Sequence, residues 1–283
     1  MSENGELARP IRSVLHPTDL TSANQLAFAH ALRIARSAST RFYLLHVDPE
    51  SEEEVDWGTF PAVRETLARW GLPAAEGAPE GTERSGVDVR KLQMHDRDPV
   101  HAILRFLDDH PVDLIILATH GRDGLPRWLH GSVAEPVARQ GDTPTLFIPL
   151  GARGFVSPET GAVSLRKIVL PVDQHPQPQR AIQMALQVAQ ALGLGDLFVQ
   201  VLHVGQGEAM PAVSASSGSV RLETALRTGN VVDQILAAAS ELDADMIVMA
   251  TAGHQGFLDA LRGSTTERVL RHAPCPVLAV PAA

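Results

Sequence analysis

The sequence predicts an α/β protein made of two tandem halves, each an open parallel five-stranded sheet flanked by helices. Short apolar runs alternate along the chain with segments whose apolar residues have helical spacing, a pattern typical of parallel sheets covered on both faces. The pattern also occurs twice. It divides the chain into a first half (residues 1–150) and a second half (residues 165–283), joined by a linker (residues 151–164). Each half has the usual size of a domain.

The duplication is clearest in two glycine-containing stretches, ATHGRDGLPRWLHGS (residues 118–132) and ATAGHQGFLDALRGS (residues 250–264). Aligned without gaps, residues 118–149 and 250–281 are identical at 13 of 32 positions, which indicates an internal repeat. Upstream, IRSVLHPTD matches LRKIVLPVD, and FYLLHV matches FVQVLHV. We therefore expect two units with one fold.

The elements of the first half can be placed in order from periodicity and caps. Apolar runs predict strands, helical spacing predicts helices, and Asp98 followed by Pro99 marks a helix start. The expected order is a strand at 13–18, a helix at 24–39, a strand at 42–47, a strand at 87–94, a helix at 98–110, a strand at 112–119, a helix from Ser132 and a strand at 144–149.

The halves differ between the second strand and the glycine loop. Val47 and Gly121 are 74 positions apart, whereas Val204 and Gly253 are 49 apart, so the second half is 25 residues shorter there. The first half has room for an amphipathic helix near residues 60–70, which we expect beside the ligand crevice. The second half has a small, polar stretch that predicts a mobile loop without this helix.

Composition excludes several classes of function. A net charge of -9 and a pI near 5.7 argue against a nucleic-acid-binding or anionic-membrane-binding surface. The longest apolar runs are too short to span a bilayer, and the start MSENGELARP lacks the features of a signal peptide. Cys275 is the one cysteine and is expected to be a buried apolar residue. A cytoplasmic location is predicted.

Each glycine loop has the features of an anion-binding turn. Gly121 lets backbone approach a ligand, and Gly131 with Ser132 opens a helix whose free N–H groups and dipole favour a phosphate. The second half repeats this arrangement with Gly253, Gly263 and Ser264. Capping boxes explain the same residues without a ligand, because Ser132 precedes Glu135 and Ser264 precedes Glu267 by three positions.

The position of the loops favours a ligand site. They follow the fourth strand of each half, at the carboxyl edge where open parallel sheets bind ligands, and Asp19 and Asp173 follow the first strands. A carboxylate there could accept hydrogen bonds from a ribose or an adenine amino group, with the backbone of Val47 or Val204 facing the base. An N-cap of the next helix is an equally good explanation of each Asp.

These motifs resemble the universal stress protein family, in particular its ATP-binding branch, whose loop has the pattern Gly, two residues, Gly, nine residues, Gly, Ser or Thr. The resemblance covers both halves nearly end to end. Both loops depart from it at the first glycine, which is Ala118 in the first half and Ala250 in the second. It implies a Rossmann-like fold, similar to the adenine nucleotide alpha hydrolases, with the last strands of the halves paired as a pseudo-dimer.

The resemblance also implies the ligand and the residues that bind it. The expected cofactor is ATP, alone or with Mg²⁺, and neither a catalytic residue nor a protein metal ligand is assigned. In the first half the site residues are Pro17, Thr18, Asp19, Val47, Ala118, His120, Gly121, Arg122, Gly131, Ser132 and Val133; in the second they are Pro171, Val172, Asp173, Val204, Ala250, Gly253, His254, Gly263, Ser264 and Thr265.

Three classes of function stay open. A nucleotide-dependent module of stress response or signalling with little or no hydrolysis fits best, since no GxxxxGK[ST] motif occurs and neither Lys91 nor Lys167 is near a loop. A slow ATP hydrolase is the second. A nucleotide-free structural or protein-interaction dimer is the third. The sequence names no protein partner and leaves a homodimer of the whole chain open.

Overall fold

The computed structural model describes residues 10–37, 40–48, 55, 57, 63–72, 87–119, 133, 136–137, 142–205, 210–215, 220–252 and 265–282. The first half contains β1 (Ser13–Thr18), the 3₁₀ turn η1 (Ser22–Asn24), α1 (Gln25–Ser37), β2 (Arg41–Asp48), α2 (Val63–Arg69), β3 (Asp88–His95), α3 (Pro99–Asp109), β4 (Leu114–Thr119) and β5 (Thr145–Pro149). The second contains β6 (Lys167–Pro171), α5 (Gln179–Ala191), β7 (Leu197–Val204), β8 (Val220–Arg227), α6 (Val231–Leu242), β9 (Met246–Thr251), α7 (Thr265–Leu270) and β10 (Val277–Pro281).

Local sequence explains where the helices begin. Asp98 accepts a hydrogen bond from Val100 N at 2.9 Å, with Pro99 as the first helical residue, which confirms the predicted cap of α3. Asn230 caps α6 in the same way, since its Oδ1 accepts from Val232 N at 3.1 Å. The equivalent helices of the two halves therefore start at equivalent caps.

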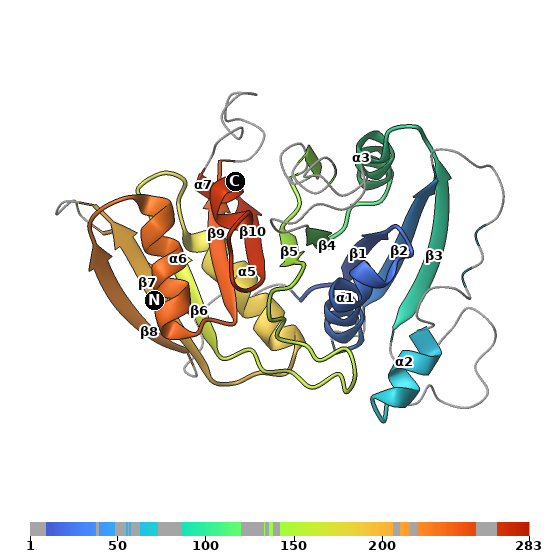
Figure 1. The fold of residues 1–283 in the computed structure, drawn as a ribbon, viewed down its shortest axis with the longest axis horizontal. Coiled ribbons are helices and arrows are strands. Elements are labelled where there is room, and N and C mark those ends of the chain that lie inside the picture. Colours follow the sequence, from blue (N-terminus) through green and yellow to red (C-terminus); the bar gives the residue numbers. More distant parts are fainter. Residues whose placement is uncertain are drawn as a thin grey trace, which may run out of the picture.

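The strands form one continuous sheet (Figure 1), in the order β3-β2-β1-β4-β5-β10-β9-β6-β7-β8. β5 and β10 pair antiparallel, with Leu146 opposite Leu278, and the other neighbouring pairs in this sheet are parallel. The predicted fold class and the predicted pairing of the last strands within one chain are confirmed. Hydrogen bonds across the seam join the two expected five-stranded sheets into one.

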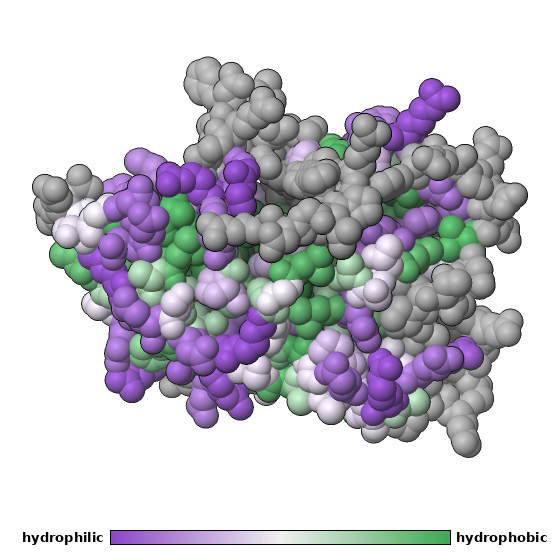
Figure 2. All heavy atoms as spheres, viewed as in Figure 1, coloured by the Kyte–Doolittle hydropathy of each residue, from purple (hydrophilic) through white to green (hydrophobic). Residues whose placement is uncertain are grey.

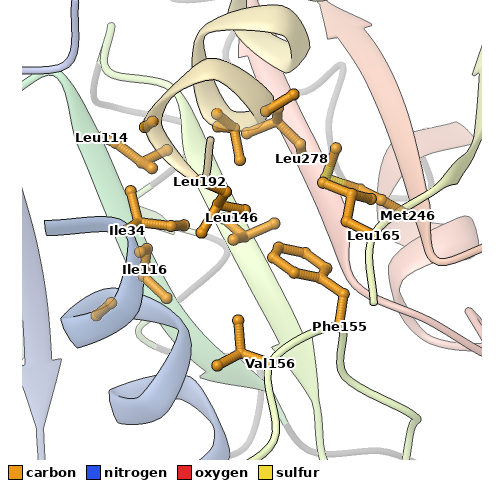
Figure 3. Close-up of a cluster of buried hydrophobic side chains, with 14 of the residues drawn as sticks. Ile34, Leu114, Ile116, Leu146, Phe155, Val156, Leu165, Leu192, Met246 and Leu278 are labelled. Carbon is orange, nitrogen blue, oxygen red and sulfur yellow. The ribbon is translucent and has the colours of Figure 1, made fainter. Parts of the chain in front are cut away.

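The halves share a hydrophobic core as well as a sheet. Figure 3 shows Ile34 of α1, Leu146 of β5 and Phe155 of the linker beside Leu192 and Leu278 of the second half. All five side chains are nearly inaccessible to solvent. Two smaller clusters, one mainly in the first half and one in the second, pack against α3 and α6 respectively. Burial across the seam therefore stabilises both halves together.

Polar residues cover most of the second half on the face drawn in Figure 2, and hydrophobic residues reach the surface in a band near the middle. Within the described part of the chain, no helix has both the length and the apolar character needed to cross a membrane.

The linker is held to α1 by a buried histidine. His30 Nε2 accepts hydrogen bonds from Phe155 N at 3.0 Å and Val156 N at 3.2 Å, and its Nδ1–H donates to Leu26 O at 2.8 Å. Because one ring nitrogen accepts and the other donates, the ring must be neutral. Burial agrees with this, since it lowers the pKa of His30 from 6.5 to about 4.

Arg153 ties the start of the linker to the second half. Its guanidinium donates to Asp243 Oδ2 and Asp245 Oδ1, each at 3.1 Å. The other oxygen of buried Asp245 accepts from the backbone N–H groups of Arg166 and Lys167, at the beginning of β6. The linker is therefore fixed at both ends.

The first half has an equivalent carboxylate, which is exposed. Asp113 Oδ2 accepts from Arg12 N at 2.7 Å and Ser13 N at 3.0 Å, at the beginning of β1. Asp113 and Asp245 thus fix the amino end of the first strand in their own halves, and Asp245 alone also holds the linker. The duplication extends to these hydrogen bonds.

The expected place of the first-half helix is wrong. α2 packs against the linker, since Trp70 Nε1–H donates to Pro158 O at 3.0 Å. Figure 1 shows α3 near the top of the first half and α2 near the bottom, at the other end of its strands. Val63 and Leu67 are buried in the shared core, so their burial determines where α2 lies. In the second half, residues 210–215 form no helix, and Met210 and Val213 pack on the same core.

We expect the protein to lose stability in mild acid. In the fold, burial lowers the pKa of His16 and of His30 to about 4, whereas the unfolded chain protonates them near pH 6.5. Between these values the unfolded state binds more protons, so the free energy of unfolding decreases as the pH falls from 7 towards 4.5, by about 2 kcal/mol per histidine. Urea denaturation at several pH values measures this slope.

The matched variants for this test are His30→Gln and His175→Gln. The first removes a buried titrating ring and should flatten the pH dependence, whatever its effect on stability at pH 7. The second removes an exposed ring and should leave the slope unchanged. An unchanged slope in His30→Gln would show that His30 is already protonated, or is accessible, in the fold.

A second expectation concerns Gly161 of the linker. A Cβ added there would lie 2.4 Å from Trp70 Cδ2, and the residue has φ +67°. Gly161→Ala should therefore destabilise the fold by roughly 2–4 kcal/mol, in part through strain at positive φ and in part through overpacking. Gly193→Ala is the control, because Gly193 has φ +71° with nothing near its Cβ position. Equal losses of thermal stability would exclude the Trp70 contact as the cause.

Candidate functional site

The candidate sites lie where the chain order of the sheet reverses, between β1 and β4 and between β6 and β9. Residue pairing between β1 and β4 covers only Val14 with Leu114 and Leu15 with Ile115, although both strands continue further. Pairing between β6 and β9 likewise covers two positions. The backbone ladder therefore ends before the carboxyl ends, at the switch point where open α/β sheets bind ligands.

The structure places most of the predicted site residues that it describes at the carboxyl ends of the strands. In the first half, β1 ends at Pro17 and Thr18 and is followed by Asp19, while Val47 and Ala118 stand at the carboxyl ends of β2 and β4. In the second half, the same places are taken by Pro171, Val172, Asp173, Val204 and Ala250. The parallel strands thus carry each set to one edge of the sheet.

Two equivalent histidines hold the strand ends. His46 Nδ1–H donates to Thr18 O at 2.8 Å, and His203 Nδ1–H donates to Val172 O at 3.0 Å. Each bond fixes the residue just before the site aspartate against the residue just before Val47 or Val204.

Asp19 already has a structural task. Its Oδ1 accepts from Thr21 N at 3.0 Å and Thr21 Oγ1 at 2.8 Å, and also from the amide of Asn24, which is buried. These bonds shape the turn that leads into α1, as a cap would. No residue of the described chain donates to Oδ2, so one oxygen is available to a ligand.

The residue after Asp19 is in a strained conformation. Leu20 has φ +61°, in the left-handed region that side chains larger than glycine rarely adopt. Its N–H donates to Thr18 Oγ1 at 3.1 Å, which helps to hold this conformation. Such strain persists where surrounding contacts determine the backbone, and it is frequent at functional sites.

Asp173 differs from Asp19. It is exposed, and the one hydrogen bond that it accepts from a described residue is from its neighbour, Gln174 N, at 2.7 Å. The carboxylate of the second half is therefore less fixed than that of the first. The two candidate sites are not copies of one another.

His16 is a site feature that the sequence analysis missed. Its ring is fully buried, and Nδ1–H donates to Ile116 O at 2.9 Å, across the gap in the β1–β4 ladder. Burial lowers its pKa to about 4, although the negative charge of Asp19 acts in the opposite direction. The repeat-equivalent residue is Leu170. This unmatched histidine in an otherwise matched strand was the available signal.

The remaining predicted residues divide into two groups. Val133 packs against the first-half core, and Thr265 is exposed as the first residue of α7. The others lie outside the described residues: His120, Gly121, Arg122, Gly131, Ser132, Gly253, His254, Gly263 and Ser264. Thr119, just before the first glycine loop, has a buried Oγ1 with no hydrogen-bond partner within the described structure.

Comparison with known proteins agrees with this fold. The model of the universal stress protein family matches residues 10–149 and 212–281, so the chain belongs to the universal stress protein family. Universal stress protein MJ0531 of Methanocaldococcus jannaschii is 29% identical over 140 residues, which cover 48% of this chain and 81% of that protein. Universal stress protein MJ0577 of the same organism is 25% identical, over 48% of this chain and 94% of that protein.

Solved structures support the fold over nearly the whole length. A universal stress protein from Archaeoglobus fulgidus superposes with a TM-score of 0.62 and 19% identity, covering 96% of this chain and 98% of that one. PA1789 of Pseudomonas aeruginosa, described as functionally unknown, gives 0.63 with 18% identity and covers 96% of this chain and 93% of that one. Both halves thus have counterparts with the same arrangement.

We expect the two site aspartates to contribute unequally to stability. Asp19→Ala removes the acceptor of several local hydrogen bonds and should lower the free energy of unfolding by about 1–2 kcal/mol. Asp173→Ala removes one exposed local bond and should change it by less than about 0.5 kcal/mol. Chemical denaturation of both variants measures this difference. Equal losses would mean that the turn after β1 does not depend on Asp19.

Proposed function

We propose that this universal stress protein binds ATP at the carboxyl edge of each half and acts as a nucleotide-dependent module in stress response or signalling, with little or no hydrolysis. The observation that carries the proposal is the repeated convergence of an aspartate and a valine backbone on the point where the β1–β4 and β6–β9 ladders end. Two ligand sites in one chain follow from it.

The described groups fit an adenine nucleotide in type. Asp19 Oδ2 and the exposed Asp173 carboxylate can accept hydrogen bonds from ribose hydroxyls or an amino group. The buried Thr119 Oγ1 offers a hydroxyl at the start of the first glycine loop. For the phosphates, the proposal relies on the sequence of the loops, with Gly121, Gly131 and their repeats, since backbone N–H groups bind phosphate without a lysine.

The lysines support binding without rapid cleavage. Lys167 Nζ donates to Leu242 O at 3.1 Å, and Lys91 Nζ lies 5.7 Å from the ring centroid of Trp57. Each ammonium group thus contacts a residue that is not assigned to a nucleotide site. Phosphoryl transfer needs charge stabilisation that increases in the transition state, whereas backbone N–H groups hold ground state and transition state about equally. With Mg²⁺ on the phosphates, turnover should stay far below the ~1–10³ s⁻¹ of typical enzymes.

The nucleotide-free alternative has one observation in its favour. Asp19 is fully explained by the turn before α1, and capping boxes would explain the loops. These structural roles are sufficient for a dimer of fused halves that binds no nucleotide. The slow hydrolase differs from the proposal only in rate, so nucleotide content and turnover must be measured separately.

The first experiment is to denature the purified protein and identify any nucleotide released, and then to titrate ligand-free protein with ATP by calorimetry. We expect two sites of unequal affinity, because Asp19 is fixed and Asp173 is not. Gly131→Val and Gly263→Val should each remove one site, since a β-branched side chain would crowd the phosphate. Gly195→Val is the control, because nothing lies near the Cβ position of Gly195. Full binding by both loop variants would favour the structural dimer.

A further inference from the structure

A cavity of about 750 Å³ lies at the seam between the halves. Its first-half wall is residues 149–152, where β5 ends and the linker begins. Its other walls come from the second half: the first turns of α6, the last turn of α7 and residues 272–274. Of the residues assigned to the nucleotide sites that the structure describes, none lines it. Its volume is within the range of small-molecule sites.

The lining combines an apolar surface with a basic one. Leu150, Val232, Leu236 and Leu270 contribute apolar side chains, and Arg268, Arg271 and His272 contribute the basic ones. A lining of this composition favours a molecule with a hydrophobic body and a negatively charged head.

The basic groups are not equally engaged. Arg271 is paired with Glu267 one turn earlier, and His272 Nδ1–H donates to Arg268 O at 3.0 Å, which fixes the ring and leaves Nε2 for another partner. The Arg268 guanidinium has no hydrogen bond or ion pair with any residue in the described chain. Within the described residues, no carboxylate forms an ion pair with this guanidinium, although Asp233 lines the same cavity.

The repeat shows which of these residues the fold requires. Glu267 and Arg271 correspond to Glu135 and Arg139, so these two residue types belong to the shared sequence pattern. Arg268 and His272 instead correspond to Pro136 and Gln140. The first-half sequence of this segment thus lacks both basic residues, which are particular to the cavity side of the second half.

We propose that the seam cavity binds a small organic anion with one carboxylate or phosphate head and an apolar body. The head accepts hydrogen bonds from the Arg268 guanidinium, and from His272 Nε2–H when both ring nitrogens carry a proton, and the body lies on the leucines and Val232. Asp233 of α6 also lines the cavity, and its negative charge disfavours a second anionic group on that wall. The ligand spans both halves, so its binding depends on the seam.

The probes for this site are phenyl phosphate and benzoate, with inorganic phosphate and benzyl alcohol as partial probes that lack the body or the charge. Amide NMR shifts are followed on the full chain in the presence of excess ATP. We expect both complete probes to shift Gly151, Ala152 and Ala273, which line the cavity, and to bind more tightly than either partial probe. Displacement by ATP, or shifts confined to other regions, would overturn the proposal.

Arg268→Gln supplies the decisive variant. It should weaken phenyl phosphate binding roughly ten-fold or more, the effect of losing a hydrogen bond to a charged group. His272→Gln should weaken it less, and Arg105→Gln, at an exposed arginine of α3 outside the cavity, should leave it unchanged. Unchanged affinity in Arg268→Gln, or equal binding of benzyl alcohol, would exclude an anion site. These readouts are independent of whether ATP binds elsewhere.

Discussion

The antiparallel ladder between β5 and β10 is the contact on which the rest of the structure depends. It turns two open sheets into one and removes an exposed edge from each, and it brings Leu146 and Leu278 into a single core with Phe155 of the linker. The linker can run across this core only because the two sheets are continuous beneath it. Without the ladder, each half would expose a strand edge and part of its core.

The linker is a structural element in its own right. His30 binds two of its backbone N–H groups, Arg153 binds two aspartates of the second half, and Trp70 packs over Gly161. The buried ring of His30 is neutral because both nitrogens are engaged, one as donor and one as acceptor. A hydrogen-bonded segment of this kind holds the relative position of the halves more firmly than a flexible connection would.

The sequence predicted what depends on local pattern and repetition. The order of strands and helices along the chain, the cap at Asp98 and the pairing of the last strands follow from periodicity, short-range chemistry and family resemblance, and the structure agrees. The contacts of His30 with Phe155 and of Asp245 with Arg153 join residues about a hundred positions apart, and no local signal marks them. The place of α2 failed for the same reason, because it depends on which distant surface buries Val63 and Leu67.

At the site, convergence of Asp19, Val47 and Ala118 could be predicted because parallel strands carry their carboxyl ends to one edge. The hydrogen bonds that each side chain forms could not be predicted. Asp19 is engaged by Thr21 and Asn24, whereas its repeat Asp173 is nearly free, and His16 crosses a gap where the other half has Leu170. Two equal motifs in sequence are thus unequal in hydrogen bonding.

Fusion of the two units by the linker has an evolutionary consequence. In a symmetric homodimer every substitution is present in both subunits. A substitution that is favourable at one position therefore also changes the equivalent position of the other subunit. In this chain a mutation changes one unit alone and leaves the other unchanged. The pairs Arg268 with Pro136 and His16 with Leu170 are differences of this kind. Because the two units belong to one chain, their sequences can differ, while the shared sheet keeps them paired.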